Sequence, residues 1–311
     1  MTIISVFPSP TGTPIANAVA QAAAGDVVIV HDGIYPEPQV TISVSNVKVV
    51  AKHEGGAVRE GSNGAAAAFI ISADSGVEIN GFVIQNYIAA AAGIIVVTGT
   101  NHRIIGNTVN NTLGAGINLN VGSGHVVWRN RVQNSSGVSG IFIASSSNWI
   151  VQNVSYKNTG TGISLGGSNN AIVGNVISEN GSPGISSIGT NNNFIYGNTA
   201  TLNSMGGVSV TSASAVLLRN LVEKNTGNGI TVAGANGFLG GNDSDENTQT
   251  GIAISSNFNS LEFNEMEFNE MEFNQNYGLV ISGNENTAFG NRFKGNKPTQ
   301  ISITGQDNNL F

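Results

Sequence analysis

Cysteine is absent from this 311-residue chain, which excludes a disulfide framework and thiolate metal sites. Charged residues make up only 10% of the sequence and aromatic residues only 6%. No segment approaches the roughly eighteen consecutive apolar residues of a membrane-spanning helix. The formal net charge of −7 argues against nucleic acid and anionic membrane surfaces as partners. Residues 1–10, MTIISVFPSP, contain no basic segment followed by a long apolar run, so no secretory signal is visible.

Glycine, asparagine and serine are abundant instead, with 41 glycines in the chain. Gly and Asn favour turns and positive φ and are poor residues for a helix interior, so the composition does not fit a helical protein. The apolar content of 40% is enough for a sizeable core.

A repeat of about 22 residues runs through most of the chain. Its first landmark is the first asparagine of an N-x-x-x-x-N unit, here called the anchor, which recurs every 22 or 23 residues. The anchors are Asn107, Asn130, Asn153, Asn175, Asn198, Asn220, Asn242 and Asn264. The second landmark is Gly followed by an aliphatic residue and then alternation, from GINLN at 116–120 to GIAIS at 251–255.

This period is too short for a propeller blade and fits one turn of a parallel β-helix, in which turns stack about 4.8 Å apart. The second residue after each anchor is apolar or small and is predicted to point inward. These residues are Val132, Ser155, Ile177, Ala200 and Val222. Stacked asparagines would hydrogen-bond along the coil. We therefore predict an all-β, single-domain parallel β-helix of about eleven turns over residues 1–311, with the cap and first turns in 1–60 and regular turns in 61–311.

The ends of the repeat differ. Residues 14–42 begin with an Ala-rich amphipathic stretch, which predicts a short helix that caps the open end of the coil. No matching cap is visible in the last residues, ISITGQDNNLF. The bare end predicts either homo-oligomerisation through the C-terminal end or a sequence trimmed from a longer protein.

The segment AVAQAAAGDVVIVHDGIYPE (18–37) resembles the entry segment of the pectin-lyase-like right-handed parallel β-helix superfamily. The N-x-x-x-x-N and Gly-aliphatic repeats resemble that superfamily's generic repeats, including those of NosD-like proteins. The resemblance implies a right-handed coil. It leaves the activity open, because the superfamily includes lyases, glycosidases, epimerases, esterases, tailspikes and non-catalytic surface proteins.

Residues 258–276, FNSLEFNEMEFNEMEFNQN, contain a tandem copy of EFNEM. The Gly-aliphatic landmark moves from Gly251 to Gly278, a step of 27 residues instead of 22. The copy therefore predicts a five-residue insertion near 264–274. Asn264 and Asn269 fit the anchor position equally well.

Acidic residues form a predicted outward column beside these anchors. Successive turns carry Glu223, then Asp243 and Asp245, then Glu265 and Glu267 (or their copies Glu270 and Glu272), then Arg292 and Lys294. Carboxylates two residues apart on a strand lie about 7 Å apart, and those on adjacent turns about 5 Å apart. Such pairs can act as acid and base or bind calcium.

One hypothesis is that this patch is a functional site. The predicted catalytic residues are Asp243, Asp245 and Glu267. The predicted calcium ligands are Asp243, Asp245, Glu265 and Glu267, and Glu246 lies in the same patch. The alternative is a solvated surface that resists edge association. Substrate-binding candidates are Arg219, Lys224, Tyr156, Arg292 and Lys294. NDSDEN followed by RFK is similar to the polygalacturonase order, but all four histidines precede residue 126, which argues against that activity.

Two histidines and several aromatic residues are further candidates. His102 and His125 occupy the position five before the anchor, where later turns carry Asn148, Asn170 and Asn193, so we interpret them as members of a polar ladder and expect no copper site. The aromatic candidates could form a sugar-stacking surface, but core or turn packing is favoured for most of them. Trp128 and Tyr196 are predicted to face inward and Tyr156 outward, and Trp149 is the fourth of these residues.

Two function classes remain. The favoured one is a non-catalytic surface or structural β-helix that binds a polysaccharide or cell-surface glycan along its flank. The alternative is a polysaccharide lyase or glycosidase that uses the acidic column with calcium. No other cofactor, no nucleic acid and no membrane insertion are expected, and an extracellular or surface location is favoured.

Overall fold

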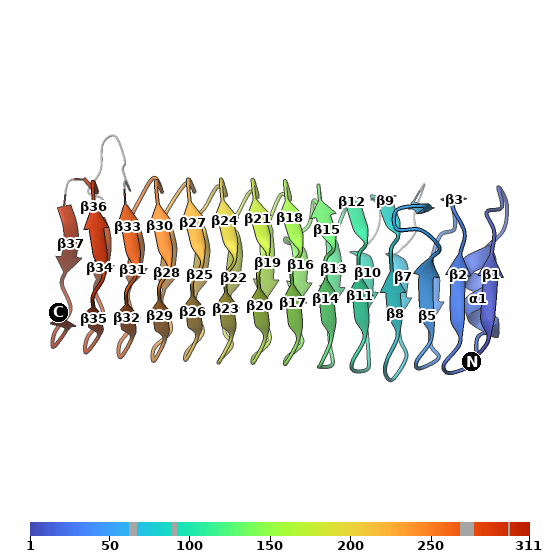
Figure 1. Ribbon diagram of the computed structural model, residues 1–311, viewed down its shortest axis with the longest axis horizontal. Coiled ribbons are helices and arrows are strands. Elements are labelled where there is room, and N and C mark those ends of the chain that lie inside the picture. The colour runs from blue at the N-terminus through green and yellow to red at the C-terminus, as the bar shows by residue number, and fades with distance from the viewer. Residues whose placement is uncertain (62–66, 89–91, 268–276, 298) are drawn as a thin grey trace. The chain divides into compact units, whose positions relative to one another are not determined.

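The computed structural model describes residues 1–61, 67–88, 92–267, 277–297 and 299–311. The chain divides into two compact units, Met1–Gly160 (unit 1) and Thr161–Phe311 (unit 2). Each unit is a coil of parallel strands that form three sheets, here called A, B and C (Figure 1). The turns number about 13, so the predicted class is confirmed and the predicted count of about eleven was low.

In unit 1 the strands repeat in the order A, B, C. Sheet A contains β1 (Ile3–Val6), β2 (Val27–Val30), β5 (Lys48–Ala51), β8 (Glu78–Asn80), β11 (Arg103–Ile105), β14 (Val126–Trp128) and β17 (Trp149–Val151). Sheet B contains β3 (Gly33–Tyr35), β6 (Ala57–Glu60), β9 (Val83–Tyr87), β12 (Thr108–Thr112), β15 (Arg131–Gln133) and β18 (Val154–Tyr156). Sheet C contains β4 (Val40–Ile42), β7 (Ala67–Ile71), β10 (Ala92–Val96), β13 (Ala115–Leu119) and β16 (Ser139–Ile143).

Unit 2 has the same three sheets. Sheet A contains β20 (Ala171–Val173), β23 (Phe194–Tyr196), β26 (Val216–Leu218), β29 (Phe238–Gly240), β32 (Ser260–Glu262), β35 (Thr287–Phe289) and β38 (Asn309–Leu310). Sheet B contains β21 (Val176–Ser178), β24 (Thr199–Thr201), β27 (Leu221–Glu223), β30 (Asp243–Asp245), β33 (Glu265–Glu267) and β36 (Arg292–Lys294). Sheet C contains β19 (Thr161–Leu165), β22 (Ile185–Ser187), β25 (Val208–Val210), β28 (Ile230–Val232), β31 (Ile252–Ile254), β34 (Tyr277–Ile281) and β37 (Thr299–Ile303).

The core of each coil consists of the inward residues of these strands. The residues predicted to point inward after each anchor are all fully buried, as are the middle residues of the sheet A strands, such as Val127 and Ile150. Because every short strand places one or two aliphatic side chains inside, stacking the turns builds a continuous apolar core that no single turn could bury alone.

Asparagine ladders line the turns between sheets A and B. Asn130 Oδ1 accepts hydrogen bonds from the backbone N–H and the Nδ2 of Asn107 at 2.9 and 3.0 Å, and Asn220 does the same for Asn198 at 3.0 Å for both. These side chains are buried, and their bonds satisfy backbone groups that the turns leave outside the sheet ladders. The predicted ladder is therefore confirmed.

The first turns lack these polar landmarks. Phe82 stands where the later turns carry an anchor, and its backbone N–H donates to Asn107 Oδ1 at 3.0 Å. Sheet pairing nevertheless begins at β1 and β2, far upstream of Asn107. The early turns therefore carry no anchor asparagine to mark them.

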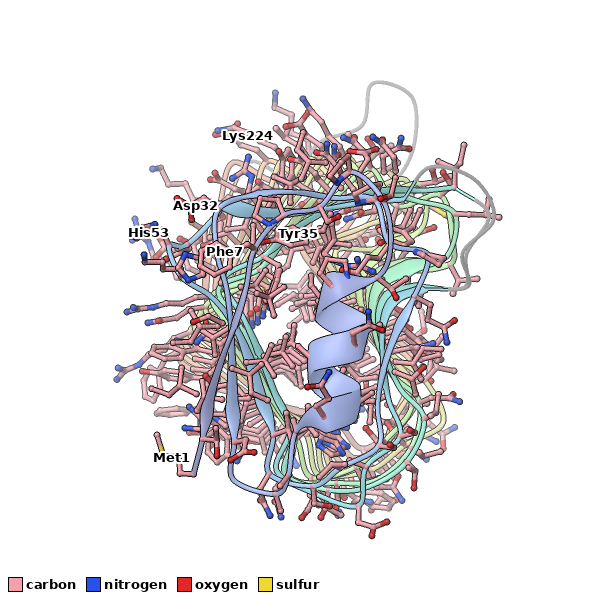
Figure 2. The ribbon with its side chains drawn as sticks, turned by 90° about the vertical axis from the view of Figure 1, so that its right-hand side faces the viewer. Met1, Phe7, Asp32, Tyr35, His53 and Lys224 are labelled. Atoms are coloured by element: carbon pink, nitrogen blue, oxygen red, sulfur yellow. The ribbon has the colours of Figure 1, made fainter. Side chains whose placement is uncertain are left out.

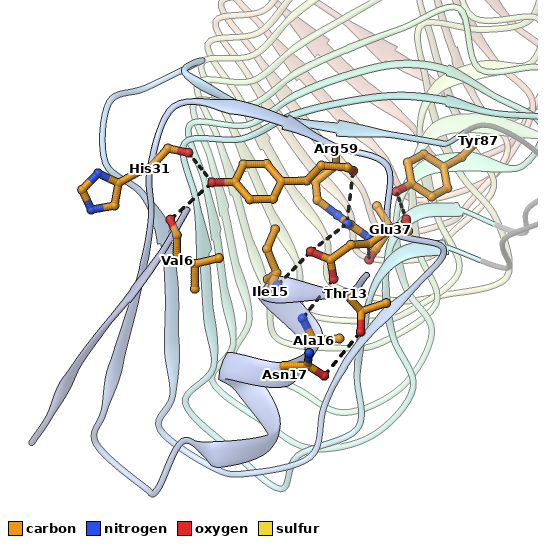
Figure 3. A network of polar contacts seen from close by, with 11 residues as sticks. Val6, Thr13, Ile15, Ala16, Asn17, His31, Glu37, Arg59 and Tyr87 are labelled. Atoms are coloured by element: carbon orange, nitrogen blue, oxygen red, sulfur yellow. Dashed lines mark hydrogen bonds and ion pairs between the residues drawn. The ribbon is translucent and has the colours of Figure 1, made fainter. Parts of the chain in front are cut away.

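The predicted cap is the helix α1 (Pro14–Gln21), which lies across the open end of the unit 1 coil (Figure 2). Its Ile15, Ala18 and Val19 are buried. Thr13 makes no side-chain cap; instead both carboxylate oxygens of Glu37 accept hydrogen bonds from the first turn, from Ile15 N at 2.8 Å and Ala16 N at 3.0 Å (Figure 3). A negative charge at this end also suits the helix dipole.

Arg59 forms an ion pair with the Glu37 carboxylate and donates a hydrogen bond to the Glu37 carbonyl oxygen. Its Nη1 lies 3.9 Å from Glu37 Oε1, and its Nη2 donates to the carbonyl oxygens of Glu37 and Ala68 at 3.1 and 3.2 Å (Figure 3). Both charged side chains are fully buried. The acidic residue of the GIYPE segment therefore attaches the cap to the coil.

The tandem copy lengthens one turn, as predicted. Asn264 donates to Asn291 Oδ1 across a step of 27 residues, at 3.0 Å from its backbone N and 2.9 Å from its Nδ2. Asn264 therefore occupies the anchor position, and Asn269 lies outside the described residues. The second copy, with Glu270 and Glu272, lies outside the described residues.

Candidate functional site

The predicted acidic column is present on sheet B of unit 2. The register pairs Leu221 with Asp243, Asp243 with Glu265, and Glu265 with Arg292 on successive strands. A second row pairs Glu223 with Asp245, and further along Glu267 with Lys294. The carboxylates of Asp243 and Glu265 thus stand at the same strand position on adjacent turns.

Cations accompany these carboxylates. Arg292 Nη1 lies 2.8 Å from Glu265 Oε1, and both side chains are well exposed. Lys224 Nζ lies 3.9 Å from Glu223 Oε1 and 3.8 Å from Glu246 Oε2. Exposed pairs of this kind stabilise a protein by about 1 kcal/mol or less. Several carboxylates of the column are therefore paired with exposed cations at the protein surface.

Asp243 differs from its neighbours. Its Oδ1 is shielded from solvent and accepts no hydrogen bond from any residue that the structure describes. Within the part of the chain that the structure describes, no three His, Cys, Asp or Glu side chains come together as a metal-binding group. Calcium binding by Asp243, Asp245, Glu265 and Glu267 remains a prediction.

The structure separates the predicted substrate-binding residues. Arg219 lies in the turn between sheets A and B, whereas Lys224 lies beyond the other end of β27, beside Glu223. Arg292 and Lys294 lie on β36, in register with Glu265 and Glu267 at the end of the acidic column. Tyr156 belongs to unit 1, where its hydroxyl accepts a hydrogen bond from Arg131 Nη2 at 2.6 Å.

Aromatic rings gather instead on the outward face of sheet A in unit 2. The rings of Phe194 and Tyr196 are parallel, with centroids 5.8 Å apart, and those of Phe263 and Phe289 meet edge to face at 5.4 Å. Phe263 is 63% exposed, which is high for a ring of this size. Rings held in fixed positions and open to solvent offer flat apolar faces for a ligand.

A hollow of about 490 Å³ opens on this face. Tyr196, Leu218, Arg219, Phe238, Glu262 and Phe263 line it together with two glycines. The glycines create the hollow: Gly240 stands in register between Leu218 and Glu262, and a Cβ there would lie 2.7 Å from Leu218 Cδ2. Arg219 and Glu262 provide polar groups at a largely apolar surface, the usual composition of a ligand site.

A related surface lies in unit 1. A shallow apolar depression with a volume of about 380 Å³ lies on sheet A, lined by Val126, Trp128, Trp149 and Val151. Trp149 is 56% exposed. At the adjoining turn, Arg129 lies over the Trp128 ring at 4.5 Å. Gln152 Oε1 accepts hydrogen bonds from Trp128 Nε1 at 3.0 Å and Arg129 Nε at 3.2 Å.

The inward placement predicted for Trp128 and Tyr196 was wrong. Both are half-buried and face outward, while their neighbours Val127 and Ile195 are fully buried. The residues that follow them, Arg129 and Gly197, have φ of 54° and 62°. A left-handed residue interrupts the strand alternation, so counting by twos back from the anchor gives the wrong face.

Sequence reasoning favoured core or turn packing for most of the aromatic residues over an outward aromatic face on sheet A. The signal was present: residues on both sides of the buried middle residue are apolar or aromatic in many of these strands, for example Phe194 and Tyr196 around Ile195. In sheet B the equivalent outward residues are mostly polar. An outward face that stays apolar over several turns indicates a contact surface.

The histidines lie in a ladder, as predicted. Their rings stack with centroids 5.1 Å apart. His102 Nδ1 accepts a hydrogen bond from Val77 N at 3.1 Å, and His125 Nδ1 accepts one from His102 N at 3.2 Å. Burial lowers the pKa of His102 and lowers that of His125 to about 4. Both rings are therefore neutral structural acceptors at pH 7.

Comparison with known proteins supports the coil architecture. A family described as the right handed beta helix region matches residues 66–221 and 161–311. The A-module of mannuronan C-5 epimerase AlgE6 from Azotobacter vinelandii has a TM-score of 0.62 at 16% identity, over 95% of this chain and 93% of that one. The Streptococcus pneumoniae surface protein and adhesin PfbA has a TM-score of 0.59 at 13% identity, over 95% and 92%.

The Dettilon tailspike protein (gp208) has a TM-score of 0.63 at 14% identity, over 96% of this chain and 68% of that one. No curated protein matches the sequence. Identities this low show the fold alone. In the described ranges, no helix has the length and apolar character needed to cross a membrane.

Proposed function

The chain belongs to the right-handed β-helix family, and on this premise we propose that it is a non-catalytic surface protein that binds a polysaccharide along the outward face of sheet A. The observation that carries the proposal is the hollow in unit 2, where Tyr196, Phe238 and Phe263 surround Arg219 and Glu262. Pyranose rings present flat C–H faces that pack on aromatic side chains, and their hydroxyls pair with charged groups.

The spacing of the turns supports an extended ligand. Equivalent side chains recur about every 4.8 Å along a parallel sheet. Apolar side chains of sheet A occupy successive strands, since Phe194, Val216 and Phe238 stand in register on β23, β26 and β29, with aromatic rings on the first and third of these. A row of this kind offers repeated contacts to a chain of sugar units, and weak contacts made together bind more tightly than each alone.

The acidic column supports a non-catalytic role. Glu265 is paired with Arg292, and Glu223 and Glu246 lie near Lys224. A general acid needs a raised pKa, which a low-dielectric pocket supplies and an exposed, cation-paired site opposes. A surface protein and adhesin of Streptococcus pneumoniae has a similar fold, and a surface or extracellular location follows from this proposal.

The test is binding of purified polysaccharides by the unaltered protein and by Phe263→Ala. The ring of Phe263 is largely exposed, so its removal should leave the fold intact. Loss of one stacking contact of about 1 kcal/mol should weaken binding roughly fivefold. Phe258→Ala is the matched control, because Phe258 is also exposed, at 51%, and does not line the hollow. Equal affinities for the unaltered protein and Phe263→Ala would contradict the proposal.

A polysaccharide lyase or glycosidase remains the second candidate. The observation that favours it is Asp243, whose Oδ1 has no hydrogen-bond partner among the described residues although it is shielded from solvent, beside Glu265 on the next turn. The test is product formation from a panel of polysaccharides, with and without calcium. Turnover that Asp243→Asn abolishes would establish this candidate and contradict the non-catalytic proposal.

A further inference from the structure

The charges of unit 1 are distributed unevenly along the chain. Residues 79–160 contain four basic side chains, Arg103, Arg129, Arg131 and Lys157, and no Asp or Glu. The net charge of the whole protein is −7, so this basic stretch runs against the overall composition. A local excess of positive charge attracts anions even on an acidic protein.

Two of these arginines are close in sequence: Arg129 lies in the turn between β14 and β15, and Arg131 is the first residue of β15. They flank the buried Asn130, so their Cα atoms are at most about 7 Å apart, and both side chains are exposed. Arg103 is paired with Glu78 at 3.3 Å. Neither Arg129 nor Arg131 has a carboxylate within 4.0 Å among the described residues. Both arginines therefore contribute net positive charge to this part of the surface.

Neighbouring side chains hold both guanidinium groups without neutralising them. Arg129 lies over Trp128 and donates to Gln152. Arg131 lies 4.3 Å from the centre of the Tyr156 ring and donates to the Tyr156 hydroxyl. These partners orient the cations and leave their charge intact. Pre-organised guanidinium groups are well suited to carboxylate and sulfate groups, which accept their hydrogen bonds in pairs.

We infer that this cluster, formed by Trp128, Arg129, Arg131, Gln152 and Tyr156, is a binding site for the anionic group of an acidic glycan. The inference rests on the proposed glycan binding. It goes further by specifying that the glycan bound by unit 1 carries negative charge. The apolar area formed by Trp128 and Trp149 next to the arginines would contact the sugar ring while the arginines bind its carboxylate or sulfate. The hollow of unit 2, with Glu262 in its lining, offers no comparable excess of positive charge.

The experiment is affinity electrophoresis of the full chain in native gels that contain polygalacturonate, dextran sulfate or neutral dextran. Arg129→Gln/Arg131→Gln is compared with Lys48→Gln/Lys52→Gln, which changes the net charge equally at exposed positions of unit 1. We expect retardation by an anionic polysaccharide, an affinity at least tenfold lower for the arginine variant, and no loss for the lysine variant. Circular dichroism confirms that both variants are folded.

Each outcome is decisive. Retardation by polygalacturonate alone or dextran sulfate alone supports the inference and identifies the anionic group. Equal losses in the arginine and lysine variants would show diffuse charge attraction and overturn it. Retardation by neutral dextran alone would overturn the inference of an anionic-group site, and the proposed glycan binding would still hold. No retardation in any gel would contradict both.

Discussion

The histidine pair makes this protein sensitive to acid. His102 and His125 accept backbone hydrogen bonds at Nδ1, and their Nε2 atoms lie 3.1 and 3.0 Å from the carbonyl oxygens of Thr98 and Val121. These contacts select the neutral tautomer with the proton on Nε2. A proton on Nδ1 would face a backbone N–H and would remove one step of the ladder.

The size of the effect follows from the pKa. The unfolded chain binds a proton at each histidine near pH 6.5, whereas burial lowers the pKa of His125 in the folded protein to about 4. Because the folded pKa is depressed, stability is full above about pH 6.5 and falls as the pH decreases toward 4. The slope is about 1.4 kcal/mol per pH unit, so His125 alone accounts for roughly 3 kcal/mol over this range.

The perturbation is His125→Asn, because the next turn carries Asn148 at the equivalent position and already accepts a hydrogen bond there, from His125 N at 2.9 Å. The amide oxygen preserves the acceptor for His102 N and cannot be protonated in this range. At pH 7 the variant and the unaltered protein should differ by about 1 kcal/mol or less. At pH 4.5 the variant should gain about 2 to 3 kcal/mol relative to the unaltered protein.

Urea unfolding followed by tryptophan fluorescence measures this difference. The only two tryptophans are Trp128 and Trp149, and Trp149 N donates to the carbonyl oxygen of His125 at 2.9 Å, so the signal reports on these turns. Carboxylates also titrate at low pH, but they are common to both proteins and cancel in the comparison. A difference between the two proteins that does not change between pH 7 and 4.5 would refute the reasoning.

Three further predictions concern stability. Glu37→Gln should lower the free energy of unfolding by about 3 kcal/mol or more, because it leaves the Arg59 charge buried without its partner, and thermal unfolding measures the loss. Asn220→Ala should cost about 2 to 4 kcal/mol in urea unfolding, since the buried backbone N–H of Asn198 loses its acceptor. Deletion of residues 268–272, one tandem copy, should change the urea midpoint by the equivalent of less than about 1 kcal/mol, because it restores the ordinary 22-residue step.

Each of these predictions has a result that would contradict it. An unchanged melting temperature for Glu37→Gln would mean that the ion pair does not secure the cap. An Asn220→Ala variant as stable as the unaltered protein would show that the ladder adds nothing at that turn. Aggregation after the deletion would indicate that the tandem copy protects the neighbouring strands.

Much of the fold was predictable because a repeated sequence repeats its local structure. The 22-residue step, the inward residues after each anchor, the asparagine and histidine ladders and the capping helix all follow from residues at fixed spacing. Parallel strands stacked in register place equivalent positions above one another. The spacing therefore also predicted that Asp243 and Glu265 form an acidic column and that Arg292 follows them on the next turn. The early turns lack this landmark, since Phe82 stands where later turns carry the anchor asparagine.

Spacing along the chain could not determine which way side chains point beyond a turn, or what they meet there. Trp128 faces outward because the left-handed conformation of Arg129 reverses the strand alternation. The unit 2 hollow exists because Gly240 leaves room between the side chains of neighbouring turns. The sequence by itself determined the coil and its polar ladders, since these repeat with the chain. Only the tertiary structure decided which outward residues form a surface, because that depends on turn conformation and on contacts between turns.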